Sequence, residues 1–77
     1  MEIKVLGTGC AKCKKLEELT EKAVNEMKLD ATIEKVEDIY KIMQFGVMRT
    51  PALVINGKVV LAGRLPKTEE LTNLLTQ

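Results

Sequence analysis

The chain has 77 residues, with 12 basic and 11 acidic side chains, two cysteines and no histidine. This length is typical of one small domain. The lack of histidine excludes Ser-His-Asp and Cys-His catalysis and zinc sites with histidine ligands. A formal net charge of +1 and only two aromatic residues provide neither a basic field nor a stacking platform, so we expect no nucleic-acid partner.

The sequence also gives no sign of a membrane or export segment. No apolar run approaches the roughly 20 residues needed to span a bilayer. The first ten residues lack the long apolar core and cleavage site of an export signal. We therefore expect a cytoplasmic protein, and in a reducing compartment disulfides are usually catalytic.

The first half of the chain predicts a strand, a long helix and a second strand. Residues 1–6 form a short run with Ile3 and Val5 on one face, as in a strand. From residue 11 to about residue 28, apolar side chains recur at steps of three and four, which predicts an amphipathic helix. Residues 31–36 alternate as a second strand would.

A short helix and a central strand follow. Asp38 is a candidate N-cap for a helix that carries Ile39, Ile42 and Met43. Gly46 stands where a left-handed residue commonly ends a helix. The run 52–55 is too apolar for a strand with one solvent-facing side, so we expect it to be buried on both faces.

The end of the chain predicts a hairpin and a last helix. Asn56-Gly57 is the strongest short hairpin signal, because a type I′ turn needs positive φ at both central residues. Residues 58–62 form the return strand, which ends at Gly63. A helix begins at Pro66 or a neighbour, and it carries Leu71, Leu74 and Leu75 on its inner face.

These elements predict one α/β domain over residues 1–77 with the order β-α-β-α-β-β-α. The first two strands should be parallel, joined by a right-handed crossover. The last two strands should form an antiparallel hairpin. The expected architecture is a four-stranded mixed sheet flanked by three helices.

Cys10 and Cys13 form a C-x-x-C pair at the first strand-to-helix junction, and three roles are open. A structural disulfide across so short a loop would stabilise the fold by only about 2 kcal/mol. A structural zinc site would need four ligands, more than two thiols supply. A two-thiolate site for a soft ion such as Cu(I) remains open, and small copper-chaperone domains carry C-x-x-C at the same kind of junction.

A redox pair is the third role, and the local charges favour it. Cys10 falls at the first helical turn, where unpaired N–H groups and the helix dipole stabilise an anion. Three lysines follow in that turn, although each one singly is more often part of a solvated face. On a helical wheel Cys13 lies toward the apolar stripe and Cys10 lies off it. We expect an exposed Cys10 thiol that titrates below the ordinary value of about 8.5, beside a shielded Cys13.

These features resemble the thioredoxin fold superfamily. The segment G-C-A-K-C, residues 9–13, matches its active-site position. Residues 45–63 are similar to the second half of a thioredoxin: glycine, aliphatic residue, Thr-Pro, strand, tight turn, strand and glycine. The chain is similar to very small archaeal and bacterial thioredoxin-like redox-active disulfide proteins. These also open with G-T-G-C-x-x-C and lack thioredoxin's first strand and helix.

The resemblance implies roles for particular residues. Cys10 would be the attacking thiolate and Cys13 the resolving thiol. Pro51 would follow a cis peptide bond and face the pair, and the Thr50 backbone would pair with an extended substrate segment. From the residues alone, a trans proline at the start of a strand is the better expectation. The other supporting positions of this substrate groove would be Gly9, Ala11, Lys12 and Gly63, although Gly63 also fits a simple strand end.

The sequence departs from thioredoxin at three places. Gly9 replaces the tryptophan before the first cysteine, and Ala11-Lys12 replaces the Gly-Pro dipeptide. The strand before the active site offers Lys4 where thioredoxin has a buried aspartate. The proton acceptor for Cys13 is therefore unassigned.

The expected function is thiol–disulfide exchange in electron transport, with a protein disulfide as substrate. A separate thioredoxin-reductase-like enzyme would recharge the pair, because the chain has no G-x-G-x-x-G element for a nicotinamide or flavin. We expect no bound cofactor, no membrane partner and a monomer. Two alternatives stay open: soft-metal binding or delivery through the same thiols, and a degenerate thioredoxin fold that only binds other proteins.

Overall fold

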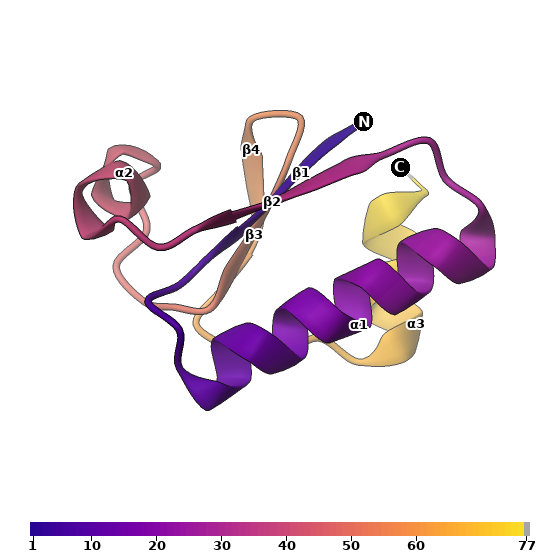
Figure 1. The fold of residues 1–77 in the computed structure, drawn as a ribbon, viewed down its shortest axis with the longest axis horizontal. Helices are drawn as coiled ribbons and strands as arrows, with labels where there is room; N and C mark the ends of the chain where they lie inside the picture. The colour runs from indigo at the N-terminus through magenta and orange to yellow at the C-terminus, as the bar shows by residue number, and fades with distance from the viewer. Residues whose placement is uncertain (77) are drawn as a thin grey trace.

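A computed structural model describes residues 1–76. Its elements follow the predicted order (Figure 1). The strands are β1 (Glu2–Leu6), β2 (Thr32–Val36), β3 (Ala52–Ile55) and β4 (Lys58–Ala62), and the helices are α1 (Ala11–Met27), α2 (Ile39–Gln44) and α3 (Thr68–Leu75). Within residues 1–76, every helix is too short or too polar to cross a membrane.

The strands form one mixed sheet in the order β2-β1-β3-β4. β1 pairs in parallel with β2 and antiparallel with β3, and β3 pairs antiparallel with β4. The predicted four-stranded mixed sheet is confirmed. In β4, Val60 is an extra residue between the pairs Leu53–Leu61 and Val54–Val59, so the hairpin contains a bulge.

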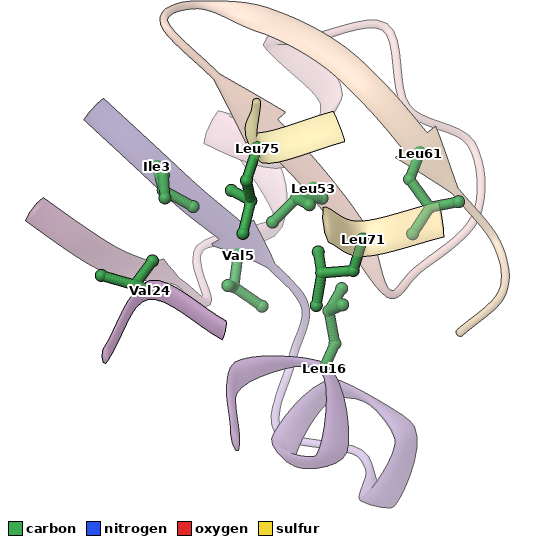
Figure 2. Packing of buried hydrophobic residues seen from close by; sticks show 8 residues of the cluster. All are labelled: Ile3, Val5, Leu16, Val24, Leu53, Leu61, Leu71 and Leu75. Atoms are coloured by element: carbon green, nitrogen blue, oxygen red, sulfur yellow. The ribbon is translucent and has the colours of Figure 1, made fainter. Parts of the chain in front are cut away.

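Helices α1 and α3 cover one side of the sheet, and α2 lies on the other side (Figure 1). Alternate residues of β1 and β3 point to opposite sides, so each central strand supplies both layers of the core. The larger layer, beneath α1 and α3, is drawn in Figure 2 and is built from Ile3, Val5, Leu16, Val24, Leu53, Leu61, Leu71 and Leu75.

The layer on the α2 side is smaller. Its buried members are Leu6, Val36, Ile42, Val47, Ala52 and Val54. Only Ile42 of α2 is buried, whereas Ile39 and Met43 of the same helix are exposed. The short helix therefore packs on the sheet through one apolar side chain and leaves two others exposed.

The predicted turns and caps are present. Asn56 and Gly57 have φ of 50° and 83°, as the hairpin turn requires, and the Asn56 Oδ1 atom accepts a 2.9 Å hydrogen bond from the Glu2 N–H. Asp38 caps α2 by accepting from the Tyr40 N–H at 2.9 Å. Gly46 has φ of 77° after the end of α2.

The last helix begins two residues later than Pro66, at Thr68, after Lys67 as the N-cap. Pro66 itself is buried in the approach to the helix. The Arg64 guanidinium donates two hydrogen bonds to the Glu70 carboxylate, one of 2.7 Å from Nη1 to Oε1 and one from Nη2 to Oε2. This contact holds the loop after β4 against the first turn of α3.

Candidate functional site

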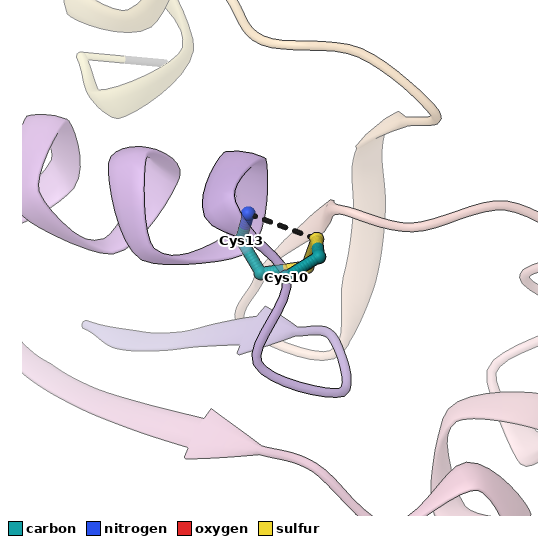
Figure 3. The surroundings of a disulfide bond; sticks show 2 residues. All are labelled: Cys10 and Cys13. Carbon is teal, nitrogen blue, oxygen red and sulfur yellow. Dashed lines mark hydrogen bonds between the residues drawn. A yellow bond between two sulfur atoms is a disulfide. The ribbon is translucent and has the colours of Figure 1, made fainter.

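Cys10 and Cys13 are joined by a disulfide where the chain leaves β1 and enters α1 (Figure 3). Their Cα atoms are 5.0 Å apart. Cys10 is exposed at the helix N-cap, whereas Cys13 is only 2% exposed, in the first turn. This is the difference in exposure that the helical periodicity predicted for the two sulfurs.

The Cys10 sulfur takes the position of a helix-capping group. The backbone N–H of Cys13 donates to Cys10 Sγ at 3.2 Å (Figure 3). Ser, Thr, Asp or Asn usually accepts this bond, and the free N–H groups of a first helical turn favour negative charge at that point. The first turn of α1 holds no acidic residue, and Lys12, Lys14 and Lys15 are exposed beside it. The surroundings of the reduced Cys10 therefore favour a thiolate.

Gly7 makes room for Cys13. A Cβ atom on Gly7 would overlap Cys13 Sγ and would lie 2.8 Å from Cys13 Cβ. The Gly7 N–H donates to the Val36 carbonyl at 2.9 Å, so β2 holds this backbone in place. The sequence alone does not reveal this role of Gly7, because its contact with Cys13 arises from the packing of α1 on β1.

Pro51 and Gly63 meet at the entrance to the central hairpin. The Thr50–Pro51 peptide bond is cis, and Pro51 is buried. The Gly63 N–H donates to the Pro51 carbonyl at 2.8 Å. Gly63 has φ of 80°, and a Cβ there would lie 3.1 Å from Arg49 Cβ. Glycine is favoured at this position for two reasons: its φ is positive, and the Arg49 side chain lies so close that a Cβ atom would crowd it.

An apolar groove of about 320 Å³ lies beside the disulfide loop. Thr8 of that loop forms one wall, and Thr50, next to Pro51, forms another. Between them the groove is lined by Ile39, Ile42, Met43, Val47 and Met48. Helix α2 and the segment that leads into β3 thus come together with the loop before Cys10.

Of the residues that the resemblance assigned to a substrate groove, Thr50 lines this apolar groove. Thr50 precedes β3, and within residues 1–76 its backbone takes part in none of the backbone hydrogen bonds of the loops and turns. The other predicted positions lie around the disulfide and the hairpin entrance. Gly9 is half-buried with φ of 91°, and Ala11 and Lys12 are exposed in the first turn of α1.

One carboxylate reaches the disulfide loop from β2. Glu37 follows that strand, and its Oε2 atom would lie 3.7 Å from a Cβ on Gly9. Its Oε1 atom is 3.6 Å from Lys35 Nζ. Lys4 of β1 instead places its Nζ 5.6 Å from the centre of the Phe45 ring, on the α2 side. The sequence did not single out Glu37, because the end of β2 meets this loop only in the folded sheet.

For metal binding, the candidate site offers the two sulfurs alone. Within residues 1–76 there is no group of three or more Cys, Asp or Glu side chains that could hold an ion. Reduced Cys10 and Cys13 would supply two thiolates.

Comparison with known proteins relates nearly the whole chain to one family. Residues 1–76 match the family model described as the thioredoxin domain. The chain is 36% identical over 76 residues to a thioredoxin of Methanothermobacter thermautotrophicus, which covers 99% of both chains. It is 39% identical over 69 residues to a thioredoxin of Methanocaldococcus jannaschii, which covers 90% of this chain and 79% of the relative.

Proposed function

Since the chain belongs to the thioredoxin family, we propose that it is a thiol–disulfide oxidoreductase that reduces protein disulfides through Cys10 and Cys13. One observation carries the proposal more than any other: the exposed Cys10 sulfur accepts the N–H of Cys13 at the start of α1. A thiolate at this position is both stabilised and accessible, which are the two requirements for attack on a disulfide.

The proposed reaction has two exchanges. The Cys10 thiolate attacks one sulfur of the substrate disulfide, which forms a mixed disulfide and releases the other substrate sulfur as a thiolate. Cys13 then loses its proton and attacks Cys10 Sγ. This step restores the Cys10–Cys13 disulfide and releases the second substrate thiol. Two electrons and two protons pass from the protein dithiol to the substrate.

The low exposure of Cys13 supports its role as the resolving thiol. Gly7 allows this side chain to lie against the end of β1, out of reach of bulk solvent and of most substrates. A buried thiol does not compete for the first attack. It lies within reach of Cys10, since the two already form a disulfide.

We assign the substrate groove to the surface between the disulfide and the hairpin entrance. Thr50, which precedes the cis peptide bond to Pro51, would present its backbone to an extended substrate segment, and Gly63 would be the close-approach glycine beside it. The remaining members would be the exposed first-turn positions and the loop before them, Gly9, Ala11 and Lys12. We propose further that residues 1–77 act as a single monomeric domain in the cytoplasm and that a separate thioredoxin-reductase-like enzyme reduces the Cys10–Cys13 disulfide again.

The test is the reduction of insulin disulfides by dithiothreitol, with wild-type protein and single cysteine variants. We expect Cys10→Ser to abolish the catalysed rate. Cys13→Ser should accumulate a mixed disulfide that mass spectrometry detects, because the first exchange proceeds and the second cannot. Turnover retained by Cys10→Ser would refute the assignment. Tight one-to-one binding of Cu(I) by a wild-type protein without reductase activity would instead favour the metal-binding alternative.

A further inference from the structure

The large apolar side chains at the protein surface gather beside the candidate site. Among residues 1–76, five such side chains are exposed, and four of them belong to residues 39–48: Ile39, Tyr40, Met43 and Met48. Met48 is 94% exposed. An apolar cluster of this kind on a small protein commonly marks an interaction site. Three of the four, Ile39, Met43 and Met48, line the groove described above.

The lining of the groove includes a residue of the loop that leads to the reactive disulfide. Thr8 in its wall precedes Cys10 by two residues, which limits the separation of their Cα atoms to about 7 Å. Thr50, which also lines the groove, directly precedes Pro51. A polypeptide that presents a cysteine to Cys10 therefore carries its neighbouring side chains over this groove.

The size and lining of the groove suit an apolar side chain. A cavity of about 150 Å³ is enough to hold a benzene ring, so 320 Å³ accommodates a leucine, methionine or phenylalanine side chain. Methionine is unbranched and polarizable, and it adapts to apolar groups of different shape. Met43 and Met48 would thus accept several apolar side chains rather than one.

The charges around the disulfide are mainly positive. Lys12, Lys14 and Lys15 project from the first turns of α1, and Arg49 lies beside Pro51 over Gly63. Within residues 1–76 these four cations form no ion pair. The two carboxylates that follow β2 are already engaged, since Glu37 pairs with Lys35 and Asp38 caps α2. The acidic residues Glu17 and Glu18 begin only after the first turn of α1. Charge complementarity therefore favours an acidic partner.

We propose that the preferred substrates are protein disulfides in segments that carry a large apolar residue and an acidic residue close to the attacked cysteine. The apolar side chain occupies the groove between Met43 and Met48, and the acidic side chain faces Lys12 and Arg49. This inference rests on the proposed function, because it defines the substrate class of the same site.

The test compares four short peptides that differ at two positions. Each contains one cysteine in a mixed disulfide with 2-mercaptoethanol, preceded by Leu or Ser and followed two residues later by Glu or Lys. Pre-reduced protein converts each mixed disulfide to the peptide thiol and free 2-mercaptoethanol, while Cys10 and Cys13 become oxidised. Mass spectrometry gives the rate constant for release of the peptide thiol.

We expect the Leu/Glu peptide to react fastest. Replacing Leu by Ser should lower its rate constant about tenfold, because a buried leucine side chain is lost. Replacing Glu by Lys should lower it several-fold, and added salt should narrow this difference, because salt screens the exposed charges. Equal rate constants for all four peptides would overturn the proposal.

Variants assign the two preferences to residues. Met48→Gln should bring the rate constants of the Leu and Ser peptides closer together, so that their ratio falls toward one. Arg49→Gln should do the same for the rate constants of the Glu and Lys peptides. Tyr40→Gln and Lys58→Gln are the controls, since Tyr40 is exposed on α2 outside the groove and Lys58 is at the far hairpin. Both controls should keep the wild-type ratios. Unchanged ratios in Met48→Gln and Arg49→Gln would overturn the proposal.

Two further outcomes separate this proposal from its premise. If the wild-type protein reduces neither the peptides nor the small neutral bis(2-hydroxyethyl) disulfide, the proposed function itself fails. If the small disulfide is reduced but the peptides show no preference, only the substrate class fails. Sedimentation of the wild-type protein as a dimer that Met48→Gln dissociates would make a second copy the occupant of the groove and would also overturn the proposal.

Discussion

The two sides of the sheet are built in different ways. On one side, α1 and α3 cover the strands with a continuous layer of aliphatic side chains, and Leu16, Leu53 and Leu75 are each at most 1% exposed. On the other side, α2 is one short helix of six residues. It buries Ile42 but leaves Ile39 and Met43 more than half exposed.

This difference separates stability from recognition. A chain of this size buries only about 60% of the surface that its unfolded state exposes. Each apolar side chain that stays exposed therefore contributes no burial free energy to a fold that has little to spare. The α1/α3 side buries nearly all of its large apolar side chains, whereas the α2 side leaves several of them exposed near the disulfide loop. We call the α1/α3 side of the sheet the closed side and the α2 side the open side. The reactive Cys10 sulfur lies at the start of α1 on the closed side, next to the loop that lines the groove on the open side.

Truncation of one leucine on the closed side should have the largest effect on stability. We expect Leu16→Ala to lower the free energy of unfolding by about 2–5 kcal/mol, because it leaves a cavity between α1 and the sheet. The matched change on the open side, Ile39→Ala, should cost less than about 1 kcal/mol. Urea denaturation of both oxidised proteins measures the difference. Equal losses of unfolding free energy would show that the two sides contribute equally to stability, which would contradict this account.

A methyl group at the boundary of the two sides should have the next largest effect. Gly7→Ala places a Cβ against Cys13, and we expect a loss of about 1–3 kcal/mol of unfolding free energy. The loss should be smaller in the reduced protein, in which the Cys13 side chain is released from Cys10 and can move. Thr8→Ala, an exposed change in the same loop, is the control and should have little effect in either redox state. An equal loss in both states would contradict this account.

The sequence predicted well the features that depend on local patterns. The bounds of β1 and β2 differ from the prediction by one residue, the Asn56-Gly57 turn is as expected, and the wheel correctly separates exposed Cys10 from buried Cys13. Periodicity and turn chemistry act over a few neighbouring residues, so they can be read from one chain.

The remaining features depend on contacts between distant segments. The need for glycine at position 7 appears only when α1 packs on β1, and the approach of Glu37 to Gly9 only when β2 joins the sheet. The pattern of Ile39, Ile42 and Met43 predicts a helix but not how many of its apolar side chains the sheet can cover. The groove was missed for this reason, although two methionines so near a Thr-Pro pair were a visible signal.

A titration would sharpen the account of the thiol at the meeting point of the two sides. In reduced Cys13→Ser protein, we expect the pKa of the Cys10 thiol to lie below the ordinary value of about 8.5, because of the helix N-terminus and the first-turn lysines. Ultraviolet absorbance of the thiolate measures it. Lys12→Gln should raise this pKa slightly, and Lys58→Gln, at the distant hairpin, should not change it. A value at or above 8.5 would remove the electrostatic argument for Cys10 as the attacking thiol.

The smallest expected effect concerns the surface contact between the loop after β4 and the first turn of α3. Hydrogen bonding from Arg64 holds the pKa of Glu70 below its ordinary value of 4.5. The ionised carboxylate therefore stabilises the folded state at all pH values above about 4.5, and this contribution is lost as the pH falls through the lowered pKa of the folded protein.

Glu70→Gln should accordingly lower the Tm by no more than a few degrees at neutral pH, since exposed ion pairs contribute little. The wild-type and variant Tm values should converge in acid, where Glu70 is protonated. Thermal unfolding followed by circular dichroism from pH 7 to about pH 2 covers this window. Glu69→Gln is the matched control, because it removes a carboxylate from the same helical turn that has no ion pair within residues 1–76. If the two variants had the same pH profile, the effect would belong to the helix dipole, and the contact with Arg64 would have no separate part in holding the loop after β4 against α3.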